Sequence, residues 1–226
     1  MRAIKKLIRQ TPIVGPSLSH LNRWLDAKKF DTSEDYWEER YRTGGNSGPG
    51  SYGRLAEFKA RKINAIVAEK GIRTVAEFGC GDGNQLLLAD YPSYVGFDVS
   101  ETVLQSCRVK FKEKKNFSFR HASSYSGEKF DLSMSLDVIF HLVEDDVFHK
   151  YMANLFSASD KYVLIYSSDF DDSGEFGAHV KNRDFKRWVG KNAPEFVLES
   201  RISNPFPFNG DHEETSFCDL FLYKRA

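Results

Sequence analysis

Residues 74–84 read Thr-Val-Ala-Glu-Phe-Gly-Cys-Gly-Asp-Gly-Asn, and this stretch decides the fold. The first five residues have the composition of a buried strand, and a short helix is predicted after the glycines, through Leu88. We expect Gly79 to allow a sharp turn, Gly81 to let a ligand lie against bare backbone, and Gly83 to permit tight packing of helix on strand. The order strand, glycine turn, helix predicts a ligand-binding edge of a parallel sheet.

A carboxylate stands at the matching point of the next predicted strand. Residues 94–97 form that strand and Asp98 ends it, nineteen residues after Gly79. A carboxylate in this place can accept hydrogen bonds from both hydroxyl groups of a ribose. The glycine turn and Asp98 together predict a nucleoside-containing ligand at the carboxyl edge of the sheet.

Strands and helices alternate along the rest of the chain. The predicted strands are 74–78, 94–97, 117–121, 130–136 and 162–166, and the predicted helices are about 55–70, 100–112, 144–156 and 179–190. Such alternation predicts an α/β fold, a parallel sheet with helices on both faces. Residues 196–202 and 216–223 are strand-like with no helix between them, so we expect an antiparallel pair at the sheet edge.

The composition excludes several classes of protein. Of the 226 residues, 41% are hydrophobic and 28% are charged, which is typical of a folded domain. Basic and acidic residues number 32 each, so no net charge attracts a nucleic-acid partner. Three scattered cysteines are too few for a disulfide framework or a zinc cluster, and we expect no metal site and a cytoplasmic location. No apolar run is long enough for a membrane span.

The net balance hides a basic N-terminal segment. Residues 1–29 carry seven basic side chains and one acidic side chain. We expect residues 1–42 to form a helical extension and residues 43–226 to form the main domain, beginning with a glycine-rich loop of functional length. The basic helix either contacts anionic lipid at the inner membrane face or a partner, or it docks on the main domain with a solvated basic face. The second interpretation is favoured.

Three segments resemble motifs of class I S-adenosylmethionine-dependent methyltransferases. Residues 75–84 resemble the first motif, residues 95–100 resemble the second, and residues 130–142 resemble the segment around the fourth strand. The terminal strand pair is also similar, and the resemblance covers about residues 50–226. It implies a Rossmann-like seven-stranded sheet, mostly parallel with an antiparallel edge strand, and S-adenosylmethionine as cofactor.

The resemblance also implies roles for individual residues. The methionine and ribose side of the cofactor would be lined by Glu77, Gly79, Gly81 and Gly83, the ribose hydroxyls would be held by Asp98, and the sulfonium would be flanked by Leu136 and Asp137. The family often has an acidic residue for the adenine amine after the third strand. This chain has Ser123 in that region, so Ser123 or the backbone would substitute. Arg54 would pair with the methionine carboxylate.

The methyl acceptor is less determined. An oxygen acceptor at neutral pH needs a base or a metal ion, and His141 and His179 are the candidate bases. The motif of many amine-directed methyltransferases is missing after residue 135. Residues 179–189 resemble a segment in small bacterial methyltransferases of surface-glycan pathways, where His179 and Arg183 would bind an anionic or sugar acceptor; the segment is equally typical of a packed amphipathic helix.

The sequence therefore predicts an S-adenosylmethionine-dependent methyltransferase that acts on a small molecule or glycan, most simply by O-methylation. Two alternatives stay open. One is a catalytically silent, cofactor-binding partner of another subunit. The other is an NAD-dependent oxidoreductase with a related sheet, against which the short glycine spacing and the edge strand pair argue.

Overall fold

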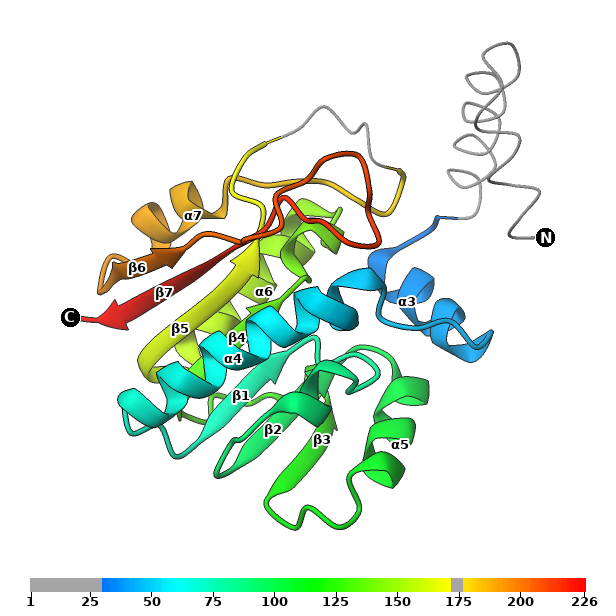
Figure 1. The fold of residues 1–226 in the computed structure, drawn as a ribbon, viewed down its shortest axis with the longest axis horizontal. Helices are drawn as coiled ribbons and strands as arrows, with labels where there is room; N and C mark the ends of the chain where they lie inside the picture. The colour runs from blue at the N-terminus through cyan, green and yellow to red at the C-terminus, as the bar shows by residue number, and fades with distance from the viewer. Residues whose placement is uncertain (1–29, 172–176) are drawn as a thin grey trace.

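Seven strands form one mixed sheet at the centre of the computed structural model, which describes residues 30–171 and 177–226 (Figure 1). The strand order is β3-β2-β1-β4-β5-β7-β6. The strands are β1 (Val75–Phe78), β2 (Tyr94–Asp98), β3 (Phe117–His121), β4 (Phe130–Leu136), β5 (Ser159–Ser167), β6 (Phe196–Ile202) and β7 (Asp219–Arg225). Strands β1 to β5 are parallel to one another, whereas β7 runs antiparallel to both of its neighbours. The predicted fold class is confirmed.

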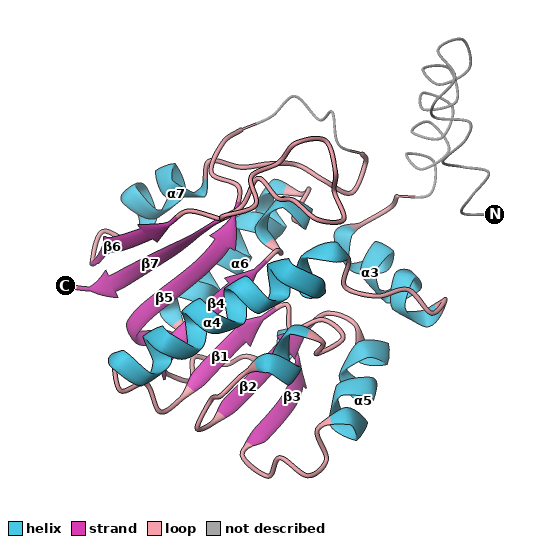
Figure 2. Cartoon of the chain, viewed as in Figure 1, coloured by secondary structure: helices cyan, strands magenta, loops and turns pink. Residues whose placement is uncertain are grey.

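Helices cover both faces of the sheet (Figure 2). The helices are α3 (Ser33–Arg42), α4 (Gly53–Glu69), α5 (Glu101–Lys110), α6 (Asp145–Ser157) and α7 (Phe185–Asn192). Apolar side chains of α4 and α5 belong to one core cluster, and those of α6 and α7 belong to the other. Short 3-10 turns lie at 49–51, 85–88, 122–124 and 139–141, mostly at the carboxyl edge of the sheet.

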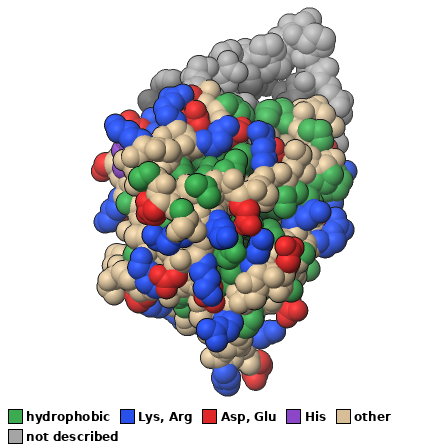
Figure 3. All heavy atoms as spheres, turned by 90° about the vertical axis from the view of Figure 1, so that its left-hand side faces the viewer, with side chains coloured by type: hydrophobic (Ala, Val, Ile, Leu, Met, Phe, Trp, Pro, Cys, Tyr) green, Lys and Arg blue, Asp and Glu red, His purple; other side chains and the backbone are tan. Residues whose placement is uncertain are grey.

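The surface carries charges of both signs. On the face seen in Figure 3, Lys and Arg side chains lie among Asp and Glu side chains. Ion pairs on α7 and β6 contribute to this mixture, for example Lys186 with Asp169 and Arg201 with Asp219. In the described part of the chain, no helix is long and apolar enough to cross a membrane.

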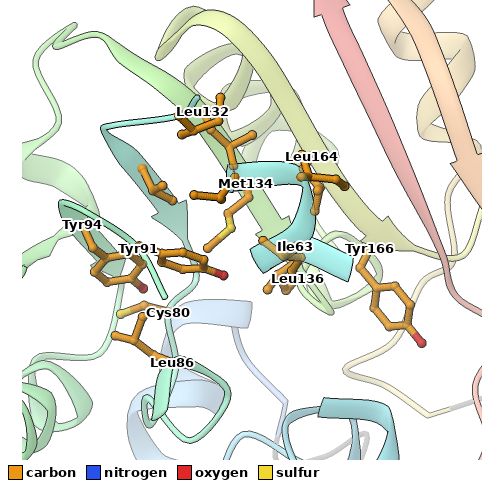
Figure 4. Close-up of a cluster of buried hydrophobic side chains, with 14 of the residues drawn as sticks. Ile63, Cys80, Leu86, Tyr91, Tyr94, Leu132, Met134, Leu136, Leu164 and Tyr166 are labelled. Atoms are coloured by element: carbon orange, nitrogen blue, oxygen red, sulfur yellow. The ribbon is translucent and has the colours of Figure 1, made fainter. Parts of the chain in front are cut away.

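The central strands are buried on both faces of the sheet. All four residues of β1 are buried, and so are six of the seven in β4, because helices cover both of their faces. Figure 4 shows one of the two clusters, in which Ile63 of α4 packs against Met134 and Leu164 of the sheet. Polar residues are buried there as well, since β1 carries Glu77 and β4 carries Ser133 and Ser135 between its apolar residues.

Several boundaries differ from the prediction, among them the start of β5, which is Ser159 rather than 162. The helix expected over 179–190 begins at Phe185, because the side chain of Asp184 accepts from the Arg187 N–H and caps it there. The segment after the glycines is a single 3-10 turn. Strand β7 begins at Asp219 rather than 216, since the Cys218 N–H donates to the Ser216 side chain in a local turn.

Helix α3 lies within the predicted N-terminal extension. The side chain of Thr32 caps it by accepting from the Asp35 N–H. Glu38 accepts a hydrogen bond from the Thr102 hydroxyl of α5, so the helix packs on the main domain. The basic segment 1–29, with its two interpretations, lies outside the described residues.

Candidate active site

A cavity of about 500 Å³ opens at the carboxyl ends of β1, β2 and β4. This volume is within the range of small-molecule pockets, about 300–1,000 Å³. The sequence-predicted site residues that line it are Glu77, Gly79, Gly81, Asp98, Ser123, Leu136, Asp137 and His141. Arg54, Gly83 and His179 are not among its lining residues. The structure thus brings together most of the predicted site from four segments of the chain.

The three glycines are required by close contacts as well as by backbone geometry. Gly79, Gly81 and Gly83 all have positive φ angles, of 81°, 55° and 69°. A Cβ on Gly79 would lie 2.4 Å from Val138 Cγ2, and one on Gly81 would lie 2.3 Å from Ser47 Oγ. The space left free at Gly81 is therefore filled by protein. Gly83 faces α5, where a Cβ would lie 2.7 Å from the Phe111 ring.

Asp98 joins the glycine turn to the next strand. Its Oδ2 accepts from the Gly81 N–H at 2.9 Å, and its Oδ1 accepts from the Ser100 N–H at 3.0 Å. The residue is buried and lines the cavity. Burial raises the pKa of the carboxyl group, while the N–H groups of Ser100 and Gly81 oppose that rise. A carboxylate has about four acceptor positions, so two are left for ligand hydroxyls.

Glu77 is a second buried carboxyl group at this edge. Burial raises its pKa to about 7, against the hydrogen bond that the Tyr94 hydroxyl donates to its Oε2 at 2.6 Å. Its charge therefore changes near neutral pH, at the carboxyl end of β1, where the residue lines the cavity.

Asp137 pairs with a cation that the sequence analysis missed. Lys59 of α4 is fully buried, and its Nζ donates to Asp137 Oδ2. Both side chains line the cavity. The missed signal is a lysine four residues after Leu55 and four before Ile63, on the apolar face of the helix. Asp137 has a φ of 59°, an uncommon backbone conformation for a residue other than glycine.

Arg54 lies outside the cavity lining, so its predicted pairing with the methionine carboxylate has no support in the geometry. Its Nε donates to the Glu214 carbonyl at 2.7 Å, and the guanidinium pairs with the Glu214 carboxylate. It also stacks on the Phe206 ring at 4.4 Å. The β6–β7 connection thus holds Arg54 at the start of α4.

Ser123 lies where the adenine contact is predicted, with a histidine beside it. The His121 ring lies 2.7 Å from Ser123 Oγ through Nδ1 and 2.9 Å from the Val99 carbonyl through Nε2. Because a carbonyl only accepts, Nε2 carries the proton and Nδ1 accepts from the Ser123 hydroxyl. Val99, His121 and Ser123 all line the cavity.

Residues 33–52, here called the cover segment, close over the glycine turn. Asp82 of the turn accepts from the Ser47 N–H at 3.0 Å and from the Tyr52 hydroxyl at 2.7 Å, and its own N–H donates to Ser47 Oγ at 2.8 Å. At the other end, the Ser33 N–H donates to Glu144 at 2.8 Å. The expected glycine-rich loop is thus part of the site.

The two candidate bases are neighbours with different exposure to the cavity. His141 lines it, and the His141 Nδ1 lies 3.0 Å from the His179 carbonyl oxygen. The rings of His141 and His179 stack at 5.7 Å, and Tyr36 stacks on His179 at 4.5 Å. Burial lowers the pKa of His141 to about 3, so its ring is neutral at physiological pH.

The Arg183 side chain is occupied by contacts within the protein. Its guanidinium donates to the Leu142 and Val143 carbonyls and to the Asp145 carboxylate, and it stacks on Phe148 at 4.5 Å. The residue is buried. These contacts use its donors to join the start of α6 to the segment before α7.

Comparisons with known proteins agree with this geometry. Residues 75–160 match the family model described as a methyltransferase domain. No curated protein sequence matches the chain.

Several solved structures are similar in fold. Magnesium protoporphyrin IX methyltransferase from Synechocystis PCC 6803, with bound S-adenosylhomocysteine, is 16% identical with a TM-score of 0.62, over 85% of this chain and 98% of that chain. The N-methyltransferase NodS from Bradyrhizobium japonicum WM9 is 14% identical with a TM-score of 0.64, over 86% of this chain and 99% of that chain. An S-adenosylmethionine-dependent methyltransferase from Clostridium acetobutylicum ATCC 824 is 14% identical with a TM-score of 0.54, over 74% and 90%.

The matched residues 75–160 contain the glycine turn, Asp98 and the end of β4, which are the parts that build the cavity. The fold of the chain is shared with the similar structures over most of its length. Residues 75–160 thus match a methyltransferase-domain family, and the chain shares the fold of solved S-adenosylmethionine-dependent methyltransferases.

Proposed function

We propose that this protein methylates an oxygen atom of a small acceptor, most simply a hydroxyl group of a sugar or glycan. The observation that carries the proposal is the position of His141, a neutral imidazole in the cavity wall. The similar structures include a porphyrin methyltransferase and an N-methyltransferase, so likeness of fold does not select the acceptor.

The residues present fit the cofactor. Asp98 offers two acceptor positions toward the cavity, and the glycine turn keeps its backbone close to them. Buried Gln85 also lines the cavity, and its Oε1 has no hydrogen-bond partner in the described part of the chain. When bound there, S-adenosylmethionine supplies an electrophilic methyl group.

The tautomer of His141 is determined by its neighbour. The His179 carbonyl can only accept, so Nδ1 of His141 carries the proton and Nε2 keeps its lone pair. Nε2 can then accept the hydrogen bond of an acceptor hydroxyl and orient its oxygen toward the methyl group. Because a pKa of about 3 makes the ring a weak base, it takes the proton only as the C–O bond forms and the oxygen becomes strongly acidic. His179 acts through its carbonyl and its stacked ring, as a positioning residue.

Aromatic side chains support a ring-shaped acceptor. Trp37 of the cover segment lines the cavity and meets the His141 ring edge-on at 4.9 Å. Tyr41, also in the wall, lies 5.7 Å from Trp37. Flat apolar surfaces beside hydrogen-bonding groups suit the apolar faces and hydroxyls of a sugar.

A coupled assay for S-adenosylhomocysteine tests the proposal. The full chain is incubated with S-adenosylmethionine and separate pools of free sugars, sugar phosphates, carboxylic acids and primary amines, and methylated products are located by mass spectrometry. We expect turnover with hydroxyl acceptors, and a loss of about 10²-fold or more in kcat for His141→Ala. Turnover only with amines would overturn O-methylation. Tight S-adenosylhomocysteine binding without turnover in any pool would favour a silent partner subunit.

A further inference from the structure

An unpartnered oxygen lies in the wall of the cavity near α4. Gln85 is 8% exposed and lines the cavity. Its Nε2 donates to the Ala56 carbonyl at 3.1 Å, which fixes the orientation of the amide. Its Oε1 is buried without a hydrogen-bond partner in the described residues. A buried acceptor left in this state costs about 1–3 kcal/mol, so the site is built to receive a donor.

A buried cation lies one helical turn further along α4. Lys59 follows Ala56 by three residues and lines the same cavity. Its Nζ donates to Asp137 and lies 5.0 Å from the Tyr166 ring. An ammonium group has three donors, and Asp137 is its one carboxylate partner in the described part of the chain. Donors are therefore left for an anionic ligand group.

A buried cation on α4 and a buried neutral acceptor held against the same helix are complementary to a zwitterion. We propose that Lys59 and Gln85 recognise the α-amino-acid end of the cofactor, with Lys59 Nζ donating to its carboxylate and Gln85 Oε1 accepting from its ammonium group. This rests on the proposed function only in its choice of cofactor. It moves the role predicted for Arg54 to a residue one turn deeper in the same helix.

The proposal also links Asp137 to occupancy of the site. Asp137 and the incoming carboxylate share the three donors and the positive charge of one ammonium group, since Lys59 is buried and has a single Nζ. Binding of the zwitterion therefore weakens the hold of Lys59 on Asp137. The Asp137 carboxylate, at the end of β4, is then available to the positive sulfonium beside it.

Two ligands that differ only at the amino-acid end test the assignment. S-adenosylhomocysteine carries the zwitterion, and 5′-methylthioadenosine keeps the adenosine and the thioether without it. Affinities of both are measured by calorimetry for the full chain and for Lys59→Met, Gln85→Leu and Lys59→Arg. The matched control is Arg54→Met, which removes a cation from the same helix outside the cavity.

We expect Lys59→Met to weaken S-adenosylhomocysteine by at least 30-fold and Gln85→Leu by 5-fold or more, with 5′-methylthioadenosine changed by less than 2-fold. Lys59→Arg should recover part of the loss, and Arg54→Met should leave both affinities within 2-fold. Equal losses for both ligands, or no loss for S-adenosylhomocysteine, would overturn the assignment.

Because Lys59→Met leaves Asp137 without its buried partner, folding is checked by thermal unfolding. If that variant does not fold, Lys59→Met/Asp137→Asn removes both charges and carries the same test. Failure of the proposed function is a separate result, because it leaves the unmodified chain unable to methylate any acceptor while the ligand affinities still report on Lys59 and Gln85.

Discussion

Replacing Asp98 with alanine removes the carboxylate that faces both the glycine turn and the cavity. Two of its acceptor positions are occupied by the N–H groups of Gly81 and Ser100, which leaves two for the ribose hydroxyls. Hydrogen bonds to a charged group contribute about 1.5–3 kcal/mol each. Their loss should cost about 3–6 kcal/mol of binding free energy, or roughly 10²- to 10⁴-fold in the dissociation constant of S-adenosylhomocysteine.

The same substitution leaves two backbone N–H groups without their acceptor, so stability falls as well. Asp131 provides the matched control, because its Oδ2 accepts from the N–H groups of Arg73 and Thr74 at the start of β4, outside the cavity lining. Asp98→Ala should lower the free energy of unfolding by about 2–6 kcal/mol, and Asp131→Ala, whose hydrogen bond from the Arg73 N–H is exposed, by about 1–3 kcal/mol. Only Asp98→Ala should weaken the ligand.

Isothermal calorimetry with S-adenosylhomocysteine gives the affinities, and urea unfolding gives the stabilities, at a temperature where both variants are folded. An Asp98→Ala affinity within fivefold of the unmodified chain would refute the ribose assignment. An equal drop in the Asp131→Ala variant would show that affinity follows stability alone.

Three further changes probe other parts of the site. Burial lowers the pKa of His141 to about 3, so between about pH 6.5 and about pH 3 the unfolded chain binds a proton at this residue and the folded chain does not. The free energy of unfolding should therefore fall by about 2 kcal/mol from pH 7 to pH 5 through this group. Urea unfolding of His141→Gln should show a pH dependence smaller by that amount. Glu77 has a pKa of about 7 and loses its negative charge as the pH falls, so the affinity for S-adenosylmethionine measured by calorimetry should decrease up to about tenfold from pH 8 to pH 6. Binding near pH 7 should release a proton from Glu77. A pH dependence that persists in Glu77→Gln would contradict this. In Gly81→Ala, at a φ of 55°, the new Cβ would lie 2.3 Å from Ser47 Oγ of the cover segment, so the affinity for S-adenosylhomocysteine in a fluorescence titration should fall tenfold or more. The control is Gly127→Ala, at a φ of 103° with open space around it. It should lower stability by about 1 kcal/mol and leave the affinity unchanged.

The fold was predictable because its information is local. The buried strand β5 contains the continuous apolar run 162–166, and the helix after β2 begins at Glu101, where the Ser100 side chain caps it. Glycines and carboxylates at strand ends then mark the site, because parallel strands present their carboxyl ends at one edge.

The parts that sequence reasoning missed depend on contacts between distant residues. Arg54 stands near the predicted place, but Glu214, 160 residues later, holds its side chain. The cover segment is joined to the domain by Ser33 and Glu144, which are 111 residues apart. Patterns in a short stretch of sequence do not indicate contacts between residues so far apart. Lys59 is the exception, because a lysine on an apolar helix face is visible in the sequence.

Asp82 gives the cover segment a consequence for the speed of the enzyme. One carboxylate ties both Ser47 and Tyr52 to the glycine turn, and the Ser47 side chain fills the space beside Gly81. We expect S-adenosylhomocysteine bound along that turn to dissociate quickly only when both hydrogen bonds to Asp82 break together. We therefore expect Asp82, which does not line the cavity, to influence how long the product stays bound and, through it, the maximal rate of repeated cycles.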